Sequence, residues 1–215
     1  MALLKSVKIL ESGSDRIAAR FDGYELPYLS AVRRLALSEV PILSIDDVII
    51  LENTSPVYDE ILAHRLGLVP LVTPEGRYPL SQECECHSAS GCPKCRVMVV
   101  LDAGTTEETR TVYSGEMMAP EDKDVKPVSD KIPIVKLAPN QRVKVEAYAR
   151  MGRGREHAKW QAATVAVLTD VADKEDAYSL ALETAGSYSS STLLRRSIMA
   201  LEKQIEEISK GLSEQ

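Results

Sequence analysis

The four cysteines of the chain all lie within a stretch of twelve residues. Cys84, Cys86, Cys92 and Cys95 follow the pattern C-x-C-x5-C-x2-C, and such local crowding favours a metal site over a disulfide framework. Zinc is the predicted occupant, because it suits soft sulfur ligands and accepts four of them without redox activity. A site filled by four protein ligands is structural. The alternatives are iron, thiols that bind no metal, and a site in which His87 replaces one cysteine.

Two other arrangements could perform acid–base or thiol chemistry. Cys92 and Cys95 have the C-x-x-C spacing of a thiol redox motif. His64 follows Asp59 and Glu60 by about one helical turn, which places an imidazole near carboxylates. No nucleophile or glycine-rich phosphate loop accompanies His64, so a structural or interfacial histidine is the favoured interpretation.

A basic segment at residues 152–159 contains Gly-Arg-Gly-Arg but lacks the full G-x-G-x-x-G spacing of a nucleotide-binding loop. Together with Arg150, it forms a local basic patch. The alternative function is therefore a free zinc module that binds nucleic acid through residues 152–159. A formal net charge of -6 argues against phosphate backbone as the main ligand.

The composition predicts a folded chain of one or two domains. It has 215 residues, of which 44% are hydrophobic and 27% charged, the balance of a globular protein. The apolar run near the first residue is too short for a signal peptide, and no apolar run is long enough to cross a membrane. We therefore expect a cytoplasmic protein.

Residues 28–41 are predicted to form an amphipathic helix that Pro41 terminates. Arg33 and Arg34 flank its apolar stripe. The stripe consists of Leu29, Val32, Leu35, Ala36 and Val40.

Residues 190–212 are predicted to form a long helix with apolar residues at alternating spacings of four and three. This heptad seam consists of Leu194, Ile198, Leu201, Ile205 and Ile208. Such a seam packs against a partner helix or against the sheet of its own domain, and periodicity alone does not separate the two.

The remaining pattern is mainly of strands. A second helix is expected to start near Asn53-Thr54-Ser55-Pro56 and to stop at Gly67 in a left-handed conformation. Connections are expected at 119–130, which should be exposed, and at 173–176. The first two expected strands should form a hairpin, Val48-Ile49-Ile50 should be well buried, and side chains of the strand at 142–150 should alternate between its two faces. The expected strands are 6–10, 16–21, 45–51, 96–101, 111–113, 132–137, 142–150, 164–168 and 178–182.

Several blocks together resemble the D subunit of archaeal DNA-directed RNA polymerase. They include LSAVRRLALSEVP (29–41), NTSPVYDEILAHRLGLVPL (53–71), GRGREHAKW (152–160) and LALETAGSYSSSTLLRRSIMALEKQIEEI (180–208). Proteins of that type are similar to the third-largest subunit of eukaryotic polymerase II and to the amino-terminal domain of the bacterial alpha subunit. The resemblance covers nearly the whole chain.

The resemblance implies an α+β fold with two domains. A dimerisation domain, an antiparallel sheet with two helices, would combine residues 1–46 with 172–215. An inserted, mainly β domain with the cysteine loop would hold residues 47–171. The implied function is that of a non-catalytic assembly subunit, which pairs with the alpha-like subunit L and docks the second-largest subunit and small zinc-bearing subunits. Contact with DNA would be indirect.

The resemblance also implies roles for particular residues. The two apolar stripes would form the dimer interface, Arg33 and Arg34 would make assembly contacts with the large subunit, and the four cysteines would match a zinc loop. Some members of this family contain an additional ferredoxin-like domain rich in cysteine. Residues 165–180 include no cysteine, so no iron-sulfur cluster of that kind is expected.

Overall fold

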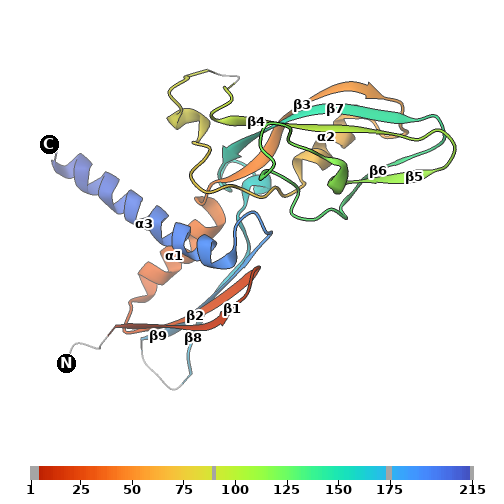
Figure 1. Ribbon diagram of the computed structural model, residues 1–215. Helices are drawn as coiled ribbons and strands as arrows, with labels where there is room; N and C mark the ends of the chain where they lie inside the picture. Colours follow the sequence, from red (N-terminus) through yellow and green to blue (C-terminus); the bar gives the residue numbers. More distant parts are fainter. Residues whose placement is uncertain (1–4, 89–90, 173–175, 214–215) are drawn as a thin grey trace. The chain divides into compact units, whose positions relative to one another are not determined.

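A computed structural model describes residues 5–88, 91–172 and 176–213. The chain folds into two compact units of α-helix and antiparallel β-sheet, so the predicted α+β class is confirmed. Unit 1 combines Met1–Pro41 with Arg153–Gln215, and unit 2 is the intervening segment Ile42–Gly152 (Figure 1). Among the described residues, no helix is both long enough and apolar enough to cross a membrane.

A four-stranded antiparallel sheet forms one layer of unit 1. The predicted hairpin at its edge is confirmed, and in its turn the backbone N–H of Gly13 donates to the carbonyl of Arg16. The cross-strand partners Ala19 and Leu180 are both buried, which marks the face that the helices cover. In spatial order the strands are β1 (Ser6–Ser12), β2 (Arg16–Asp22), β9 (Ala177–Thr184) and β8 (Ala163–Asp170).

Two helices, α1 (Leu26–Ser38) and α3 (Ser190–Ser213), form the second layer of unit 1. α1 packs on α3, β8 and β9, whereas α3 packs also on β9 and β2. The hydroxyl of Tyr188 donates to the carbonyl of Pro41 (3.1 Å), which ties the segment before α3 to the segment after α1. The C-terminal half of α3 extends past α1 and the sheet (Figure 1).

The ends of α1 differ from the prediction. The helix begins at Leu26, because Pro27 occupies its first turn, where a missing backbone N–H leaves no bond unmade. It ends at Ser38, and the N–H of Glu39 donates to the carbonyl of Leu35 as the final bond. Val40 therefore lies outside the helix, although its side chain is buried.

Unit 2 is built on a three-stranded antiparallel sheet with β7 at its centre. Side chains of β7 alternate between buried and half-buried positions, which confirms the predicted pattern of that strand. A two-stranded sheet, a helix and two short 3-10 helices complete the unit. The elements are β3 (Ile42–Asn53), α2 (Asp59–Gly67), η1 (Ser81–Glu83), β4 (Arg96–Gly104), β5 (Arg110–Tyr113), η2 (Ser114–Glu116), β6 (Pro133–Leu137) and β7 (Arg142–Gly152); η3 (Ala158–Trp160) belongs to unit 1.

The predicted start of α2 was wrong, and its predicted stop at Gly67 was right in position but wrong in conformation. α2 begins at Asp59, and the side-chain amide of Asn53 instead closes the preceding turn by donating to the carbonyl of Val57 (2.8 Å). Gly67 is the last helical residue and does not have a positive φ. Its carbonyl accepts a hydrogen bond from the hydroxyl of Ser44 (2.9 Å), and a Cβ at this position would lie 3.6 Å from the carbonyl oxygen of Ile45, an ordinary contact that does not require glycine.

β3 was predicted to be well buried near Val48-Ile49-Ile50, and this was wrong for Ile49, whereas Val48 and Ile50 are half-buried against the core. Its first residues, from Ile42 to Ile45, are buried, whereas Ile49 is 48% exposed and Leu51 is 50% exposed. Burial alternates along this part of the strand: Val48 and Ile50 pack against the core of unit 2, whereas Ile49 and Leu51 lie on the other face. The two exposed apolar side chains therefore belong to a face of β3 that no layer covers.

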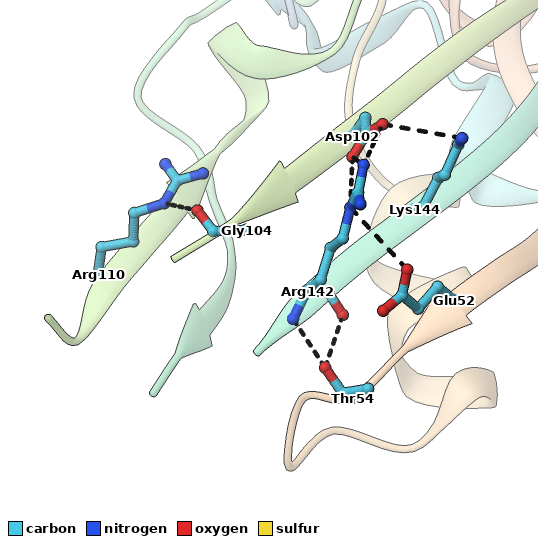
Figure 2. A network of polar contacts seen from close by, with 7 residues as sticks. All are labelled: Glu52, Thr54, Asp102, Gly104, Arg110, Arg142 and Lys144. Carbon is cyan, nitrogen blue, oxygen red and sulfur yellow. Dashed lines mark hydrogen bonds and ion pairs between the residues drawn. The ribbon is translucent and has the colours of Figure 1, made fainter. Parts of the chain in front are cut away.

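A network of charged side chains joins the strands at one end of this sheet (Figure 2). The guanidinium of Arg142 donates from Nε and Nη2 to Asp102 (2.9 and 2.8 Å), and Lys144 lies 3.9 Å from the same carboxylate. The backbone N–H of Arg142 also donates to the hydroxyl of Thr54 (2.7 Å), just past β3. The side chains are 38–48% exposed, so solvent screening keeps their contribution modest.

The connection at residues 119–130 was predicted to be exposed, yet several of its side chains are buried. Asp122 is 9% exposed and accepts a hydrogen bond from the hydroxyl of Tyr78 (2.7 Å) and another from the guanidinium of Arg77. Arg77 also donates to Asp124 (2.8 Å). Burial alone raises the pKa of Asp122, but the two donated hydrogen bonds outweigh it and hold the pKa below its ordinary value.

The chain passes between the two compact units at 41/42 and 152/153, and the expected domain boundaries at 46/47 and 171/172 stay a prediction. β8 pairs with β9 over its length and so belongs to unit 1. The segment before β8 packs on α1: a Cβ on Gly154 would lie 2.1 Å from the carbonyl oxygen of Leu37. Of the connection expected at 173–176, residues 173–175 lie outside the described residues.

Replacement of Gly154 by alanine should destabilise the chain. The added methyl group would overlap a backbone carbonyl at the end of a helix, which cannot rotate away, so we expect a loss of at least about 1–3 kcal/mol. Chemical denaturation of the parent chain and the variant measures this change in the free energy of unfolding. Gly211→Ala is the matched control: nothing lies within 4 Å of its Cβ position, and the exchange in a helix should be neutral or stabilising by up to about 1 kcal/mol. Equal stability of the two variants would contradict the packing described.

Asp122→Asn should lower stability at pH 7 by about 1–2 kcal/mol, because charge-assisted hydrogen bonds are replaced by weaker ones. The folded-state pKa of Asp122 is depressed, so its contribution is full above the unfolded value of about 3.9 and is lost as the pH falls through the lower folded value. The gap between the variant and the parent chain should therefore narrow below about pH 4. Asp124→Asn is the control: the Asp124 side chain is 68% exposed, so its replacement should lower the stability less.

Candidate functional site

The cysteine loop lies between η1 and β4. Cys84 directly follows η1, and Cys95 directly precedes β4. The backbone N–H groups of Cys95 and Arg96 both donate to the carbonyl of Cys92 (3.0 Å each), which forms a tight turn. Gly91 enters this turn with a φ of 74°, a conformation that glycine adopts without strain.

The four sulfur atoms converge as a metal site requires. All lie within 4.8 Å of one another, and the Sγ–Sγ distances are 3.8 Å for Cys84–Cys92 and 3.9 Å for both Cys86–Cys95 and Cys92–Cys95. A tetrahedral ion with zinc–sulfur bonds of about 2.3 Å places its ligands about 3.8 Å apart. Among the described residues His87 does not join the group. The four cysteines therefore fit a metal ion.

The thiols differ in acidity. The backbone N–H of Lys94 hydrogen-bonds the sulfur of Cys92 and lowers its pKa to about 7, whereas burial raises the pKa of Cys95 to about 12. A lowered thiol pKa is also what a redox motif uses. Such a motif needs only Cys92 and Cys95, however, and leaves the convergence of Cys84 and Cys86 unexplained.

The predicted apolar stripe of α1 lies in the core of unit 1. Every one of its five residues is at most 8% exposed, so in this chain they pack against the sheet and α3. Their contact with a partner stays a prediction. The residues are Leu29, Val32, Leu35, Ala36 and Val40.

The stripe of α3 is largely open. Ile198, Ile205 and Ile208 are 45%, 52% and 67% exposed, and Leu194 and Leu201 are half-buried. Leu212, omitted from the predicted seam, continues the same spacing and is 71% exposed. An extended apolar surface of this kind marks an interaction site.

Arg33 is half-buried and Arg34 is exposed on α1. Within the described residues, neither guanidinium forms a hydrogen bond or an ion pair. Both are available to carboxylates outside the chain. His64 is exposed on α2 and belongs to no metal-binding group of the described residues, so an acid–base role has no support.

The basic segment at 152–159 has an internal role. Arg153 and Arg155 lie 3.7 and 3.3 Å from the carboxylate of Glu39, and the backbone N–H of Arg155 donates to the carbonyl of Ser38 (3.1 Å). Arg150 is bound to an aspartate within unit 2. These arginines neutralise the chain's own carboxylates and helix end, which weakens the case for nucleic-acid binding.

Comparison with known proteins identifies the family to which the sequence is similar. The family described as "RNA polymerase Rpb3/RpoA insert domain" matches residues 40–171. Proteins named DNA-directed RNA polymerase subunit Rpo3 are similar to the chain. Those of Methanosphaera stadtmanae, Thermococcus kodakarensis and Aeropyrum pernix are 42%, 46% and 40% identical over 161, 154 and 169 residues, which cover 74%, 72% and 76% of this chain.

The matched regions make up 58%, 55% and 58% of those three relatives, so the chain spans less than two thirds of their length. The family match includes the cysteine loop and all of unit 2. The resemblance inferred from the sequence blocks is confirmed: the chain belongs to the RNA polymerase Rpb3/RpoA family, with archaeal Rpo3 subunits among its relatives.

Proposed function

We propose that this chain is a non-catalytic assembly subunit of a DNA-directed RNA polymerase, which pairs through α3 with the alpha-like subunit L. The open apolar stripe of α3 supports this most directly, because it is the largest set of exposed apolar side chains on one helix of the described residues. The names of the relatives support the polymerase assignment.

The stripe has the size that pairing needs. Fully burying an exposed isoleucine or leucine contributes about 1.5–3 kcal/mol, so four such side chains supply a large share of an obligate interface. Interfaces of that class bury more than about 2,000 Å² in total. In this proposal the α1 stripe contributes indirectly, because its buried side chains hold α3 in position on the sheet.

Arg33 and Arg34 are proposed to dock the second-largest subunit. A guanidinium presents several donors in a fixed plane and binds a carboxylate through two hydrogen bonds at once. Two adjacent guanidiniums without partners in the described part of the chain are suited to an acidic surface. The small zinc-bearing subunits complete the proposed assembly, and contact with DNA is indirect.

The cysteine loop is proposed to hold one structural zinc ion. The ion would join the end of η1 to the start of β4 through Cys84 and Cys95. No iron-sulfur cluster is proposed, because the four cysteines form one tetrahedral group suited to a single ion.

Ile205→Asp should abolish pairing with subunit L while leaving the chain folded, because it places a charge in the stripe at an exposed position. Co-expression followed by size-exclusion chromatography measures pairing. Met199→Asp is the matched control: Met199 is 52% exposed, lies about 120° around the helix from Ile205, and should pair normally. Pairing by Ile205→Asp, or none by the parent chain, would contradict the proposal.

The same assay distinguishes the role of the arginines from the role of the α1 stripe. Arg33→Ala should pair normally and reduce only the later recovery of the second-largest subunit. Leu35→Asp should lose pairing through misfolding, since Leu35 is 8% exposed within unit 1. Circular dichroism distinguishes its loss of fold from the intact fold of Ile205→Asp.

The purified chain should contain one zinc ion per molecule by elemental analysis. Cys92→Ser should bind zinc at least about tenfold more weakly, because a ligand that completes the tetrahedron is lost. His87→Asn should retain the ion, since His87 lies outside the group. Iron in place of zinc, or a Cys92→Ser chain with full zinc content, would overturn this assignment.

A further inference from the structure

A groove runs past the cysteine turn on the surface of unit 2. On one side of the turn lies a cleft of about 750 Å³, and on the other a cleft of about 430 Å³. Pro93 and Glu121 line both, so the two clefts meet along these residues. We call them together the Pro93 groove. The larger cleft has the volume of a ligand-binding pocket.

The larger cleft is acidic. Glu85 and Glu121 line it, with Lys94 as the cation among the loop residues. Asp122 and Arg77 also line it but neutralise one another through their hydrogen bond. Four thiolates around a divalent ion would add a formal charge of about −2 beside this cleft. The side chain that fits here is therefore a cation.

The smaller cleft is apolar and aromatic. Ile49, which is 48% exposed, and the half-buried Met98 and Tyr148 line it. The guanidinium of Arg96 lies 4.1 Å from the centre of the Tyr148 ring, and it donates to Asp47 (2.8 Å). Arg96 is thus held in place, and the tyrosine ring has a fixed orientation. The exposed Ile49 on the uncovered face of β3 supplies the apolar contact.

We propose that the Pro93 groove binds an extended segment of a partner protein in which a lysine or arginine and a large apolar residue are separated by a few residues. The basic side chain enters the acidic cleft beside Glu121, and the apolar side chain covers Ile49 and Met98. This site lies in unit 2 and goes beyond the proposed pairing through α3, which belongs to unit 1.

The cysteine turn forms the middle wall of the groove. Pro93 lies between Cys92 and Lys94 in the turn, and the sulfur atoms of Cys92 and Cys95 are both in the converging group. A metal ion at these sulfurs fixes the position of Pro93. In this proposal the same loop holds the metal ion and forms a wall of the binding groove.

Fluorescence anisotropy with labelled peptides tests the proposal on the full zinc-loaded chain. The probes contain one lysine and one leucine separated by one, two or three glycines, with glutamate in place of lysine and serine in place of leucine as references. At least one lysine–leucine peptide should bind saturably and about tenfold more tightly than both references. Glu121→Lys should weaken that binding about tenfold.

Glu107→Lys is the matched control, with the same charge change at an exposed residue outside the groove, and should bind as the parent chain does. The proposal is overturned if no probe binds saturably up to millimolar concentration, if the reference peptides bind equally, or if Glu107→Lys weakens binding as much as Glu121→Lys. The Ile205→Asp chain should still bind the probe, so loss of pairing and loss of groove binding are separate results.

Discussion

The contact between the end of α1 and the segment that follows unit 2 is the constraint on which unit 1 depends. The chain leaves unit 1 after Pro41 and returns at Arg153. At the point of return, the backbone of Gly154 lies against the carbonyl of Leu37, and two arginines bind Glu39. Only a residue without a side chain permits this approach. The position of the chain as it returns to unit 1, just before β8, therefore depends on a glycine.

The sequence predicted the local features well where residue type dictates structure. The cysteine spacing indicated a four-ligand group, and alternation along β7 indicated its buried face; both agree with the geometry. The start of α2 was missed because Asn53 has two competing uses, as a helix cap and as a brace for a turn, and only tertiary packing selects between them. The conformation of Gly67 was misread because a glycine at a helix end suggests a left-handed stop, whereas here its φ is not positive and a Cβ would find ordinary contacts.

The two apolar helices show a limit of periodicity. α1 and α3 have comparable stripes, yet the first is buried in its own unit and much of the second is open. The difference arises from length and position: α1 lies across β8 and β9, whereas the later turns of α3 extend past the sheet. Hydrophobic spacing reports that a helix face needs cover, but not which chain provides it. The groove beside Pro93 was missed for a related reason, because its walls come from segments distant in sequence.

The discontinuous build of unit 1 has a consequence for synthesis on the ribosome. Unit 2 is contiguous and can collapse as soon as residues 42–152 have emerged, while β2 and α1 must wait with uncovered apolar faces for β9 and α3. The last element translated in the described chain is thus both the missing part of the unit's core and the open stripe. If the chain pairs through α3 as proposed, the exposed stripe would therefore emerge after unit 2 and the strands of unit 1.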